Sequence, residues 1–369
     1  MPLGVFQPGV FALDVGGSSV VALHVTGDAG SLKLRACYEW PLPEGLVVDG
    51  EIVDGDLFAR ELRAFVSEHK LRGRAVHLAV SNQKVIVRNI DMPEMTEEEL
   101  RGAIEFQAQD YIPIPVDEVV LDFQVISKHV AADGGARQEV LLVAAQRTMI
   151  NTFIHSVRQA GLKVAGIDVA SLALVRALIA PTPFLPEDEH AVHCRGIVDV
   201  ASSVTTLVVA VDKIPKFTRI INFSSDRFPR ALAEFRHIPF DDAQTMVQRV
   251  GLPGPLPADE ELYSDEVLQE TRTQLAQVAA ELTDEIRRSF DYYHSQENAL
   301  PVQELILSGR GALLRNLDAQ LSDALGILVK IGNPLVRISQ NLSGVADESL
   351  AFLAPYLAVA VGLAVPEDD

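Results

Sequence analysis

The chain has 369 residues, of which 48% are hydrophobic and 22% are charged, and its formal net charge is −20. This composition is typical of a soluble globular protein with a large core, and the length suggests two or three domains. The negative charge argues against unassisted binding to nucleic acid or to an anionic membrane, and it favours a basic partner segment. The cysteines, Cys37 and Cys194, show neither metal-ligand spacing nor a disulfide framework, which fits a reducing, cytoplasmic compartment.

The stretch FALDVGGSSVVALHV, residues 11–25, places an aspartate and a small-residue turn between two apolar runs. This pattern predicts a β-hairpin, and a turn without side-chain bulk lets backbone N–H groups approach phosphate oxygens closely. Asp14 at the strand end is a candidate ligand of a hydrated magnesium ion. The candidate phosphate ligands are Gly16, Gly17, Ser18 and Ser19. For this turn taken alone, a plain hairpin is the simpler interpretation.

A second stretch, GIVDVASSVTTLVVAV at residues 196–211, repeats this layout. Aligning Asp14 with Asp199 sets DVGGSSV against DVASSVT, so the sequence predicts two related α/β halves that each open with a hairpin. Asp199 becomes the second candidate magnesium ligand. The other polar residues that would face the same ligand from this half are Ser202, Ser203, Thr205 and Thr206.

Residues 83–160, between the two hairpins, have a different character. VIVRNIDMP predicts a strand that ends at Pro93, and Thr96 with Glu99 form a capping box that begins a helix. LDFQVI and EVLLVAAQ predict two strands joined by the glycine turn at 134–135, and a helix with one apolar face follows. The β-α-β-β-α order predicts a small domain inserted into the first half.

Two later segments complete the candidate ligand site. LSGRGALLRNL, residues 307–317, predicts a strand that enters a glycine turn and then a helix. There, Gly309 and Gly311 would let an adenine or a ribose pack closely, and Arg310 could add a cation. On a long amphipathic helix, Glu285 and Arg288 either reach the nucleotide base or form a surface ion pair between positions i and i+3.

The apolar stretch at residues 350–365 is shorter than the roughly 20 residues of a membrane-spanning helix, so we expect a buried helix. A proline-rich, acidic linker separates the two halves. The predicted division of the chain is a first lobe at 9–82 and 161–182, the inserted domain at 83–160, a second lobe at 191–342 with a helical subdomain at about 225–300, and a terminal helix at 343–365 that returns to the first lobe.

Four segments of the sequence point to a known family. They are DMPEMTEEELRGAIEFQAQDYIPIPVDEVVLDFQVI (91–126), VLLVAAQRTMINTFIHSVRQAGLKVAGIDVASLALVRAL (140–178), EIRRSFDYYHSQ (285–296) and LSGRGALLRNL. Their order, with the two hairpins, resembles the actin-like ATPase superfamily and, within it, the PilM family of type IV pilus assembly proteins. The part around YIPIPVDEVVLDF is specific to that family, whereas the glycine turns are shared by the superfamily.

The resemblance implies an α/β, actin-like fold of two duplicated RNase H-like lobes with a small inserted β-α-β-β-α domain. It also implies a cytoplasmic scaffold at the inner face of the cytoplasmic membrane, with ATP and magnesium as ligands. Such a scaffold binds the N-terminal cytoplasmic peptide of PilN in a groove between the first domain and the inserted one, and other inner-membrane or motor components are further expected partners. We expect the capping-box helix and the YIPIP segment to line that groove.

Three departures from the superfamily pattern bear against nucleotide binding. Ala201 stands where a glycine is usual, Ser224 and Ser225 replace a double-glycine turn, and Arg310 replaces another glycine. A Cβ at such a position can block close backbone approach or a positive φ. No residue shows the pattern of a catalytic base, so we expect at most weak ATP hydrolysis.

Two alternative functions follow from the same superfamily. An FtsA-like, membrane-associated filament protein would end in a basic amphipathic helix, whereas this chain ends in VGLAVPEDD. A small-molecule kinase would need a catalytic carboxylate that the sequence does not reveal, and such kinases generally lack an inserted unit at this position.

Overall fold

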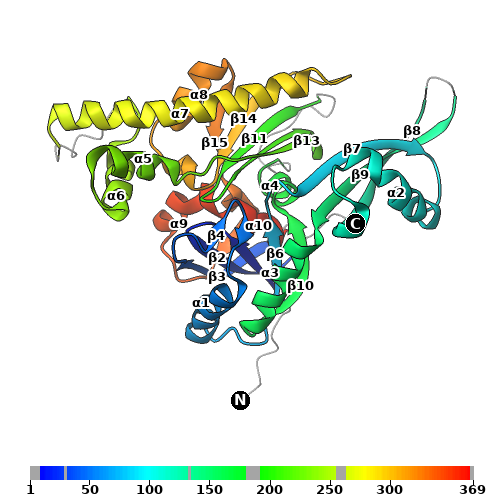
Figure 1. Ribbon diagram of the computed structural model, residues 1–369, viewed down its shortest axis with the longest axis horizontal. Helices are drawn as coiled ribbons and strands as arrows, with labels where there is room; N and C mark the ends of the chain where they lie inside the picture. The colour runs from blue at the N-terminus through cyan, green and yellow to red at the C-terminus, as the bar shows by residue number, and fades with distance from the viewer. Residues whose placement is uncertain (1–8, 29–30, 132–133, 180–191, 255–262, 366–369) are drawn as a thin grey trace.

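The computed structural model describes residues 9–28, 31–131, 134–179, 192–254 and 263–365. Two α/β lobes lie one above the other, and a module of three strands and a helix projects to one side (Figure 1). The two-lobe organisation predicted from the duplicated hairpins is confirmed.

The first lobe is built on a six-stranded mixed sheet with the order β10-β6-β1-β2-β3-β16. The β1–β2 hairpin is antiparallel, and β6 runs parallel to β1. Helices α1 (Gly55–Glu68) and α3 (Arg147–Gln159) bury Phe58, Phe65 and Phe153 in one core cluster with residues of β1 and β6. The strands are β1 (Val10–Val15), β2 (Ser19–Thr26), β3 (Leu32–Pro41), β6 (Ala75–Val80), β10 (Lys163–Val169) and β16 (Ile338–Asn341), beside a small pair, β4 (Val47–Val48) and β5 (Glu51–Ile52).

The second lobe repeats the central arrangement in a five-stranded sheet of order β13-β12-β11-β14-β15. Here β11 and β12 form the antiparallel hairpin, and β14 runs parallel to β11. The strands are β11 (Cys194–Val200), β12 (Thr205–Val211), β13 (Ile214–Ile221), β14 (Glu304–Ser308) and β15 (Leu328–Ile331). The helices are α5 (Arg227–Arg236), α6 (Phe240–Val250), α7 (Asp265–His294), η2 (Arg310–Leu313) and α8 (Leu317–Leu325). The short helix η3 (Pro334–Arg337), which follows this lobe in the chain, packs against α4 and α10.

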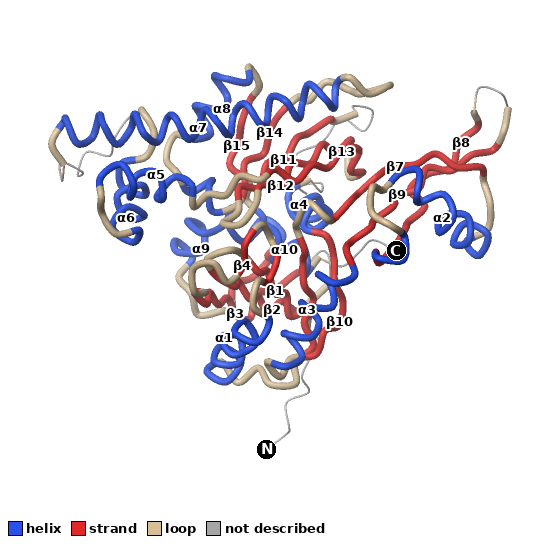
Figure 2. The backbone as a smooth tube through the Cα atoms, viewed as in Figure 1, coloured by secondary structure: helices blue, strands red, loops and turns tan. Residues whose placement is uncertain are grey.

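Two helices, α4 (Ala170–Leu178) and α10 (Ala358–Ala364), lie between the two sheets (Figure 2). One core cluster joins them to Ala12 and Leu23 of the first sheet and to Ile197 and Val208 of the second. Their contact is close, because a Cβ added at Gly362 would lie 1.9 Å from the backbone oxygen of Ala173. The lobes are therefore joined by a shared apolar core.

The terminal segment Asp347–Ala364 comprises α9 (Asp347–Leu353), η4 (Ala354–Leu357) and α10. By length and composition alone it could cross a membrane, yet 67% of it is buried inside the protein. The expected buried helix is therefore confirmed, and α10 lies in the core between the lobes.

The projecting module consists of an antiparallel sheet of order β7-β9-β8 covered by α2 (Glu97–Tyr111). The strands are β7 (Val85–Pro93), β8 (Val119–Val130), which follows the short helix η1 (Val116–Glu118), and β9 (Ala136–Gln146). The predicted capping box is confirmed, because the Thr96 amide donates to Glu99 Oε2 at 2.9 Å and the Glu99 amide donates to Thr96 Oγ1 at 3.4 Å.

Two elements lie outside the units to which the sequence assigned them. The helix α3, expected to end the inserted domain, packs against α1 and buries its apolar face in the first-lobe core. The strand β16, expected in the second lobe, pairs in parallel with β3 at the edge of the first sheet. The apolar face of a helix shows that it packs against something, and an edge strand shows that it can pair with another strand. The sequence near each element does not show which packing or pairing partner the tertiary fold supplies.

Candidate functional site

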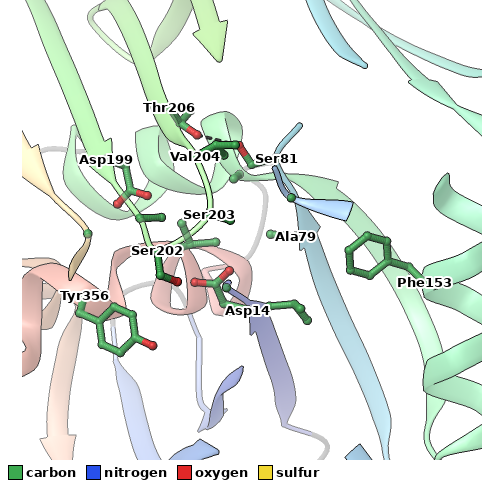
Figure 3. Close-up of a pocket in the computed structure, with 17 residues that line it drawn as sticks. Asp14, Ala79, Ser81, Phe153, Asp199, Ser202, Ser203, Val204, Thr206 and Tyr356 are labelled. Atoms are coloured by element: carbon green, nitrogen blue, oxygen red, sulfur yellow. Dashed lines mark hydrogen bonds between the residues drawn. The ribbon is translucent and has the colours of Figure 1, made fainter. Parts of the chain in front are cut away.

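The turns of the two central hairpins meet between the lobes. The first turn follows Val15 and the second follows Val200, and both contribute to one cavity of about 40 Å³ (Figure 3). Asp14 and Gly16 line this cavity from one lobe, and Asp199, Ser202 and Ser203 line it from the other. The structure thus brings together the two aspartate-containing turns that are 185 residues apart.

The contact between the turns is a direct hydrogen-bonded one. The hydroxyl oxygen of Ser202 accepts from the backbone N–H of Gly17 at 2.8 Å and from that of Ser18 at 3.3 Å. A Cβ added at Gly17 would lie 2.8 Å from the Ser202 carbonyl oxygen, and one added at Gly16 would lie 2.7 Å from the Ser202 hydroxyl. The glycines of the first turn are therefore required for the close approach of the second turn.

The two aspartates have raised pKa values. Burial raises the pKa of Asp14 to about 7, and the nearby negative charge of Asp199 contributes to this rise. Burial also raises the pKa of Asp199 to about 6, and a hydrogen bond from Ser308 opposes part of that rise. Buried acidic groups with raised pKa values are typical of functional sites, and a bound cation would reverse the direction of the shift.

The third small-residue turn, at Gly309 and Gly311, packs on the end of β11. Gly309 has a φ of 81°, and a Cβ added there would lie 2.6 Å from the carbonyl oxygen of Val200. A Cβ added at Gly311 would lie 2.6 Å from Cβ of Val200. Both glycines are needed for this packing inside the second lobe, and Gly309 also lines the cavity between the aspartates. Their role in accommodating an adenine or a ribose stays a prediction.

Arg310 crosses from the second lobe to the first. Its Nη2 donates to Glu39, to the Ser19 hydroxyl at 3.2 Å and to the Tyr356 hydroxyl at 3.0 Å. The guanidinium carbon also lies 4.5 Å from the centroid of the Tyr356 ring. The arginine that replaces a glycine of the superfamily pattern is therefore engaged by the protein itself.

The alanine of the second turn is accommodated without a strained backbone. Ala201 is not among the described residues with positive φ. Its amide donates to the Val204 carbonyl at 3.1 Å, and its carbonyl accepts from the Ser225 amide at 2.8 Å. The turn at Ser224 and Ser225 thus supports the second hairpin.

Three candidate residues make contacts within the second lobe. The Thr205 hydroxyl donates to the Phe223 carbonyl at 2.7 Å inside the second lobe. Glu285 and Arg288 form an ion pair of 2.5 Å on α7. Neither is among the described residues that line the cavity between the aspartates or the adjoining cavity of about 980 Å³. The surface ion pair is therefore the interpretation that fits α7.

The cleft between the lobes also contains residues that were not predicted from the sequence. Ser81, at the end of β6, pairs its hydroxyl with that of Thr206 across the lobes at 2.7 Å. Glu39 and Tyr356 bind Arg310, and a neighbouring cavity of about 980 Å³ is lined by Glu44, Asp226 and Arg230 among others. Of these residues, Ser81 is the one that the sequence could have suggested as a site residue. It directly follows the apolar strand β6, which runs parallel to β1 of the first hairpin.

The two turns line two cavities of different size. The cavity between the aspartates has about 40 Å³, whereas a ligand pocket usually needs about 300 Å³ or more. The neighbouring cavity of about 980 Å³ is large enough for a ligand, and its lining includes Gly17, Ser18, Ser19, Ser202, Ser203 and Arg310. The amides of Gly17 and Ser18, which would bind phosphate, are bonded to Ser202. In this arrangement the protein supplies its own acceptor for those amides.

A second candidate site lies between the first lobe and the projecting module. This cavity, which we call the lobe–module groove, has a volume of about 700 Å³ and is lined by β6, β10, α4 and α10 on one side and by β8 and β9 on the other. Its charged lining residues include Asp122 and also Asp168, which forms an ion pair with Arg176. Its apolar lining residues include Val80, Val120, Leu141, Val143, Ile167, Leu172 and Leu363.

The YIPIP segment lines a separate cavity. That cavity has a volume of about 1140 Å³ and is enclosed by Glu105 and Gln109 of α2, the segment 112–117 and the start of β8. Val120 lines both cavities. The lobe–module groove lies where the sequence predicts a groove between the first domain and the inserted one. Among the described residues, neither the capping-box helix nor the segment 111–115 lines it.

The fold is shared with solved structures of known proteins. The ethanolamine utilization protein EutJ from Carboxydothermus hydrogenoformans is 14% identical with a TM-score of 0.54, and the match covers 99% of this chain and 91% of that chain. MreB5 of Spiroplasma citri, solved with bound ADP, is 15% identical with a TM-score of 0.53, and the match covers 96% and 95% of the two chains. At these identities the likeness shows an actin-like α/β fold, as expected from the sequence.

A nearer likeness is to a PilM-PilN type IV pilus biogenesis complex. That structure is 26% identical with a TM-score of 0.77, and the match covers 97% of this chain and 98% of that chain. The sequence profile of the family described as type IV pilus assembly protein PilM matches residues 12–367. This chain therefore belongs to the PilM family of type IV pilus assembly proteins.

Proposed function

We propose that this protein is an actin-like scaffold of type IV pilus assembly that binds the N-terminal cytoplasmic peptide of a PilN-type protein in the lobe–module groove. The observation that carries the proposal is the groove itself, which has about 700 Å³ and walls from two separate units of the fold. Similarity to a chain solved as a PilM-PilN complex supports the choice of partner.

The chemistry of the groove suits an extended, amphipathic peptide. Its apolar walls would contact every second side chain of an extended peptide. The strands β10 and β8 are edge strands of their sheets, so their backbone groups could form hydrogen bonds with the peptide backbone. Asp122 and the net charge of −20 favour a peptide with lysine or arginine, since opposite potentials speed encounter and orient partners.

The proposal places the protein on the cytoplasmic side of the membrane, held there by the tail of its partner and by other pilus inner-membrane or motor components. A phosphate of ATP with magnesium would reach the amides of Gly17 and Ser18 only by displacing the Ser202 hydroxyl from them. Any hydrolysis would be weak, because the amides of Gly17 and Ser18 that would hold a phosphate are bonded to Ser202.

A pair of matched variants tests which cavity holds the peptide. Ile167→Lys puts a cation on the wall of the lobe–module groove, and Ile114→Lys puts one in the cavity beside the YIPIP segment. Both residues are partly buried, so the two substitutions perturb the fold to a similar degree. In calorimetric titrations with the PilN peptide, we expect Ile167→Lys to abolish binding and Ile114→Lys to retain it. The reverse result would move the peptide to the other cavity.

A further inference from the structure

We propose that Ser202 occupies the anion site of the first hairpin turn and thereby holds the two lobes closed without a nucleotide. The proposal goes beyond the adaptor function and does not depend on the partner peptide. It starts from the disagreement between the ligand that the actin-like fold implies and the contacts that this chain makes.

The hydroxyl of Ser202 makes the contacts that a phosphate oxygen would make. A phosphate-binding turn works by pointing successive backbone N–H groups at one oxygen. Here the N–H groups of Gly17 and Ser18 point at one oxygen, at 2.8 and 3.3 Å, and that oxygen belongs to the facing lobe. Each of these bonds joins the lobes, because Gly17 follows β1 of the first sheet and Ser202 follows β11 of the second.

The close contact between the two turns also depends on the backbone at Gly17, in addition to the Ser202 side chain. The Cβ that Gly17 lacks would lie 2.8 Å from the carbonyl oxygen of Ser202 and 3.3 Å from the amide nitrogen of Ser203. Any residue but glycine would therefore push the two turns apart. In a phosphate-binding turn, a glycine leaves room for the phosphate. Here Gly17 leaves room for the second turn.

Further contacts close the same cleft around Ser202. The Ser81 and Thr206 hydroxyls are 2.7 Å apart, and Arg230 Nη1 lies 2.8 Å from Glu44 Oε1. Arg310 binds Glu39 of the first lobe. These side chains therefore join the lobes across the cleft through contacts of the protein alone.

Hydrogen exchange of the nucleotide-free, full-length protein tests the proposal. Ser202→Ala removes the shared acceptor, and Ser203→Ala is the matched control, because the hydrogen bonds of the described residues include none from the Ser203 hydroxyl to the first turn. We expect the amides of Gly17 and Ser18 to exchange about tenfold faster in Ser202→Ala than in the wild type or in Ser203→Ala. Equal exchange in all three proteins would overturn the proposal.

Small-angle X-ray scattering of the wild type provides a second readout that needs no variant. If Ser202 holds the lobes closed, the radius of gyration of the nucleotide-free protein should stay the same when ATP and magnesium are added. A decrease on addition would show that the lobes are open until nucleotide closes them, and it would overturn the proposal even if Ser202→Ala failed to fold.

Discussion

Asp14 and Asp199 face one cavity from opposite lobes, and the charge of Asp199 contributes to raising the pKa of Asp14 to about 7. A carboxyl group whose pKa is raised by folding destabilises the folded state when it is ionised. This cost is absent below the unfolded pKa of 3.8 and is complete above the folded pKa of about 7. The contribution of the pair should therefore lower the stability as pH rises from about 4 to 7.

Asp14→Asn should remove much of that pH dependence. The amide is neutral at every pH, so we expect the variant to be more stable than the wild type at pH 8, by a few kcal/mol at most, and to differ less from it at pH 5. Urea unfolding at the two pH values, in metal-free buffer, measures this difference. Asp28→Asn, at an exposed loop position, is the control. A loss of stability in Asp14→Asn at pH 8 would mean that the ionised carboxylate is stabilising.

Gly362→Ala tests the close contact between α10 and α4. The added Cβ would lie 1.9 Å from the Ala173 carbonyl oxygen, so the helices must separate. We expect a loss of roughly 1–3 kcal/mol in the free energy of unfolding, which is the usual cost of overpacking. Gly102→Ala on α2 is the matched control, because nothing lies within 4 Å of its added Cβ. That control should gain up to about 1 kcal/mol from helix propensity.

A double-mutant cycle on Arg310 and Glu39 measures how strongly this ion pair joins the lobes. The Arg310 side chain is 20% exposed and that of Glu39 is 41% exposed, so solvent screens the pair in part. We expect Arg310→Ala and Glu39→Gln to couple by roughly 0.5–1.5 kcal/mol in thermal or urea unfolding. Strict additivity would show that the arginine acts independently of this partner, for example through the Tyr356 ring.

Much of the fold followed from local patterns in the sequence. The duplicated strand–Asp–small-turn–strand stretches predicted both central hairpins, and the capping box placed the start of α2. Such features depend on residues that are near each other in the chain, and one sequence records them well.

The parts that could not be predicted depend on contacts between distant residues. Nothing near Ser202 shows that its hydroxyl would bind the amide of Gly17. Likewise, no local signal connects Arg310 with Glu39, or assigns α3 to the first lobe. The glycines of the first turn were predicted to be site residues from the sequence. Their role in allowing the close approach of the second turn depends on the positions of both lobes, which the sequence does not show.

The central claim, that this chain is an adaptor for a PilN-type tail, is tested most directly by calorimetric titration of the full-length protein with the N-terminal cytoplasmic peptide of PilN. The titration is run in nucleotide-free buffer and again with ATP and magnesium. We predict saturable binding of one peptide per chain in both buffers, because the lobes are already closed by the protein's own contacts. An absence of binding heat in both buffers, with correctly folded protein, would contradict the account.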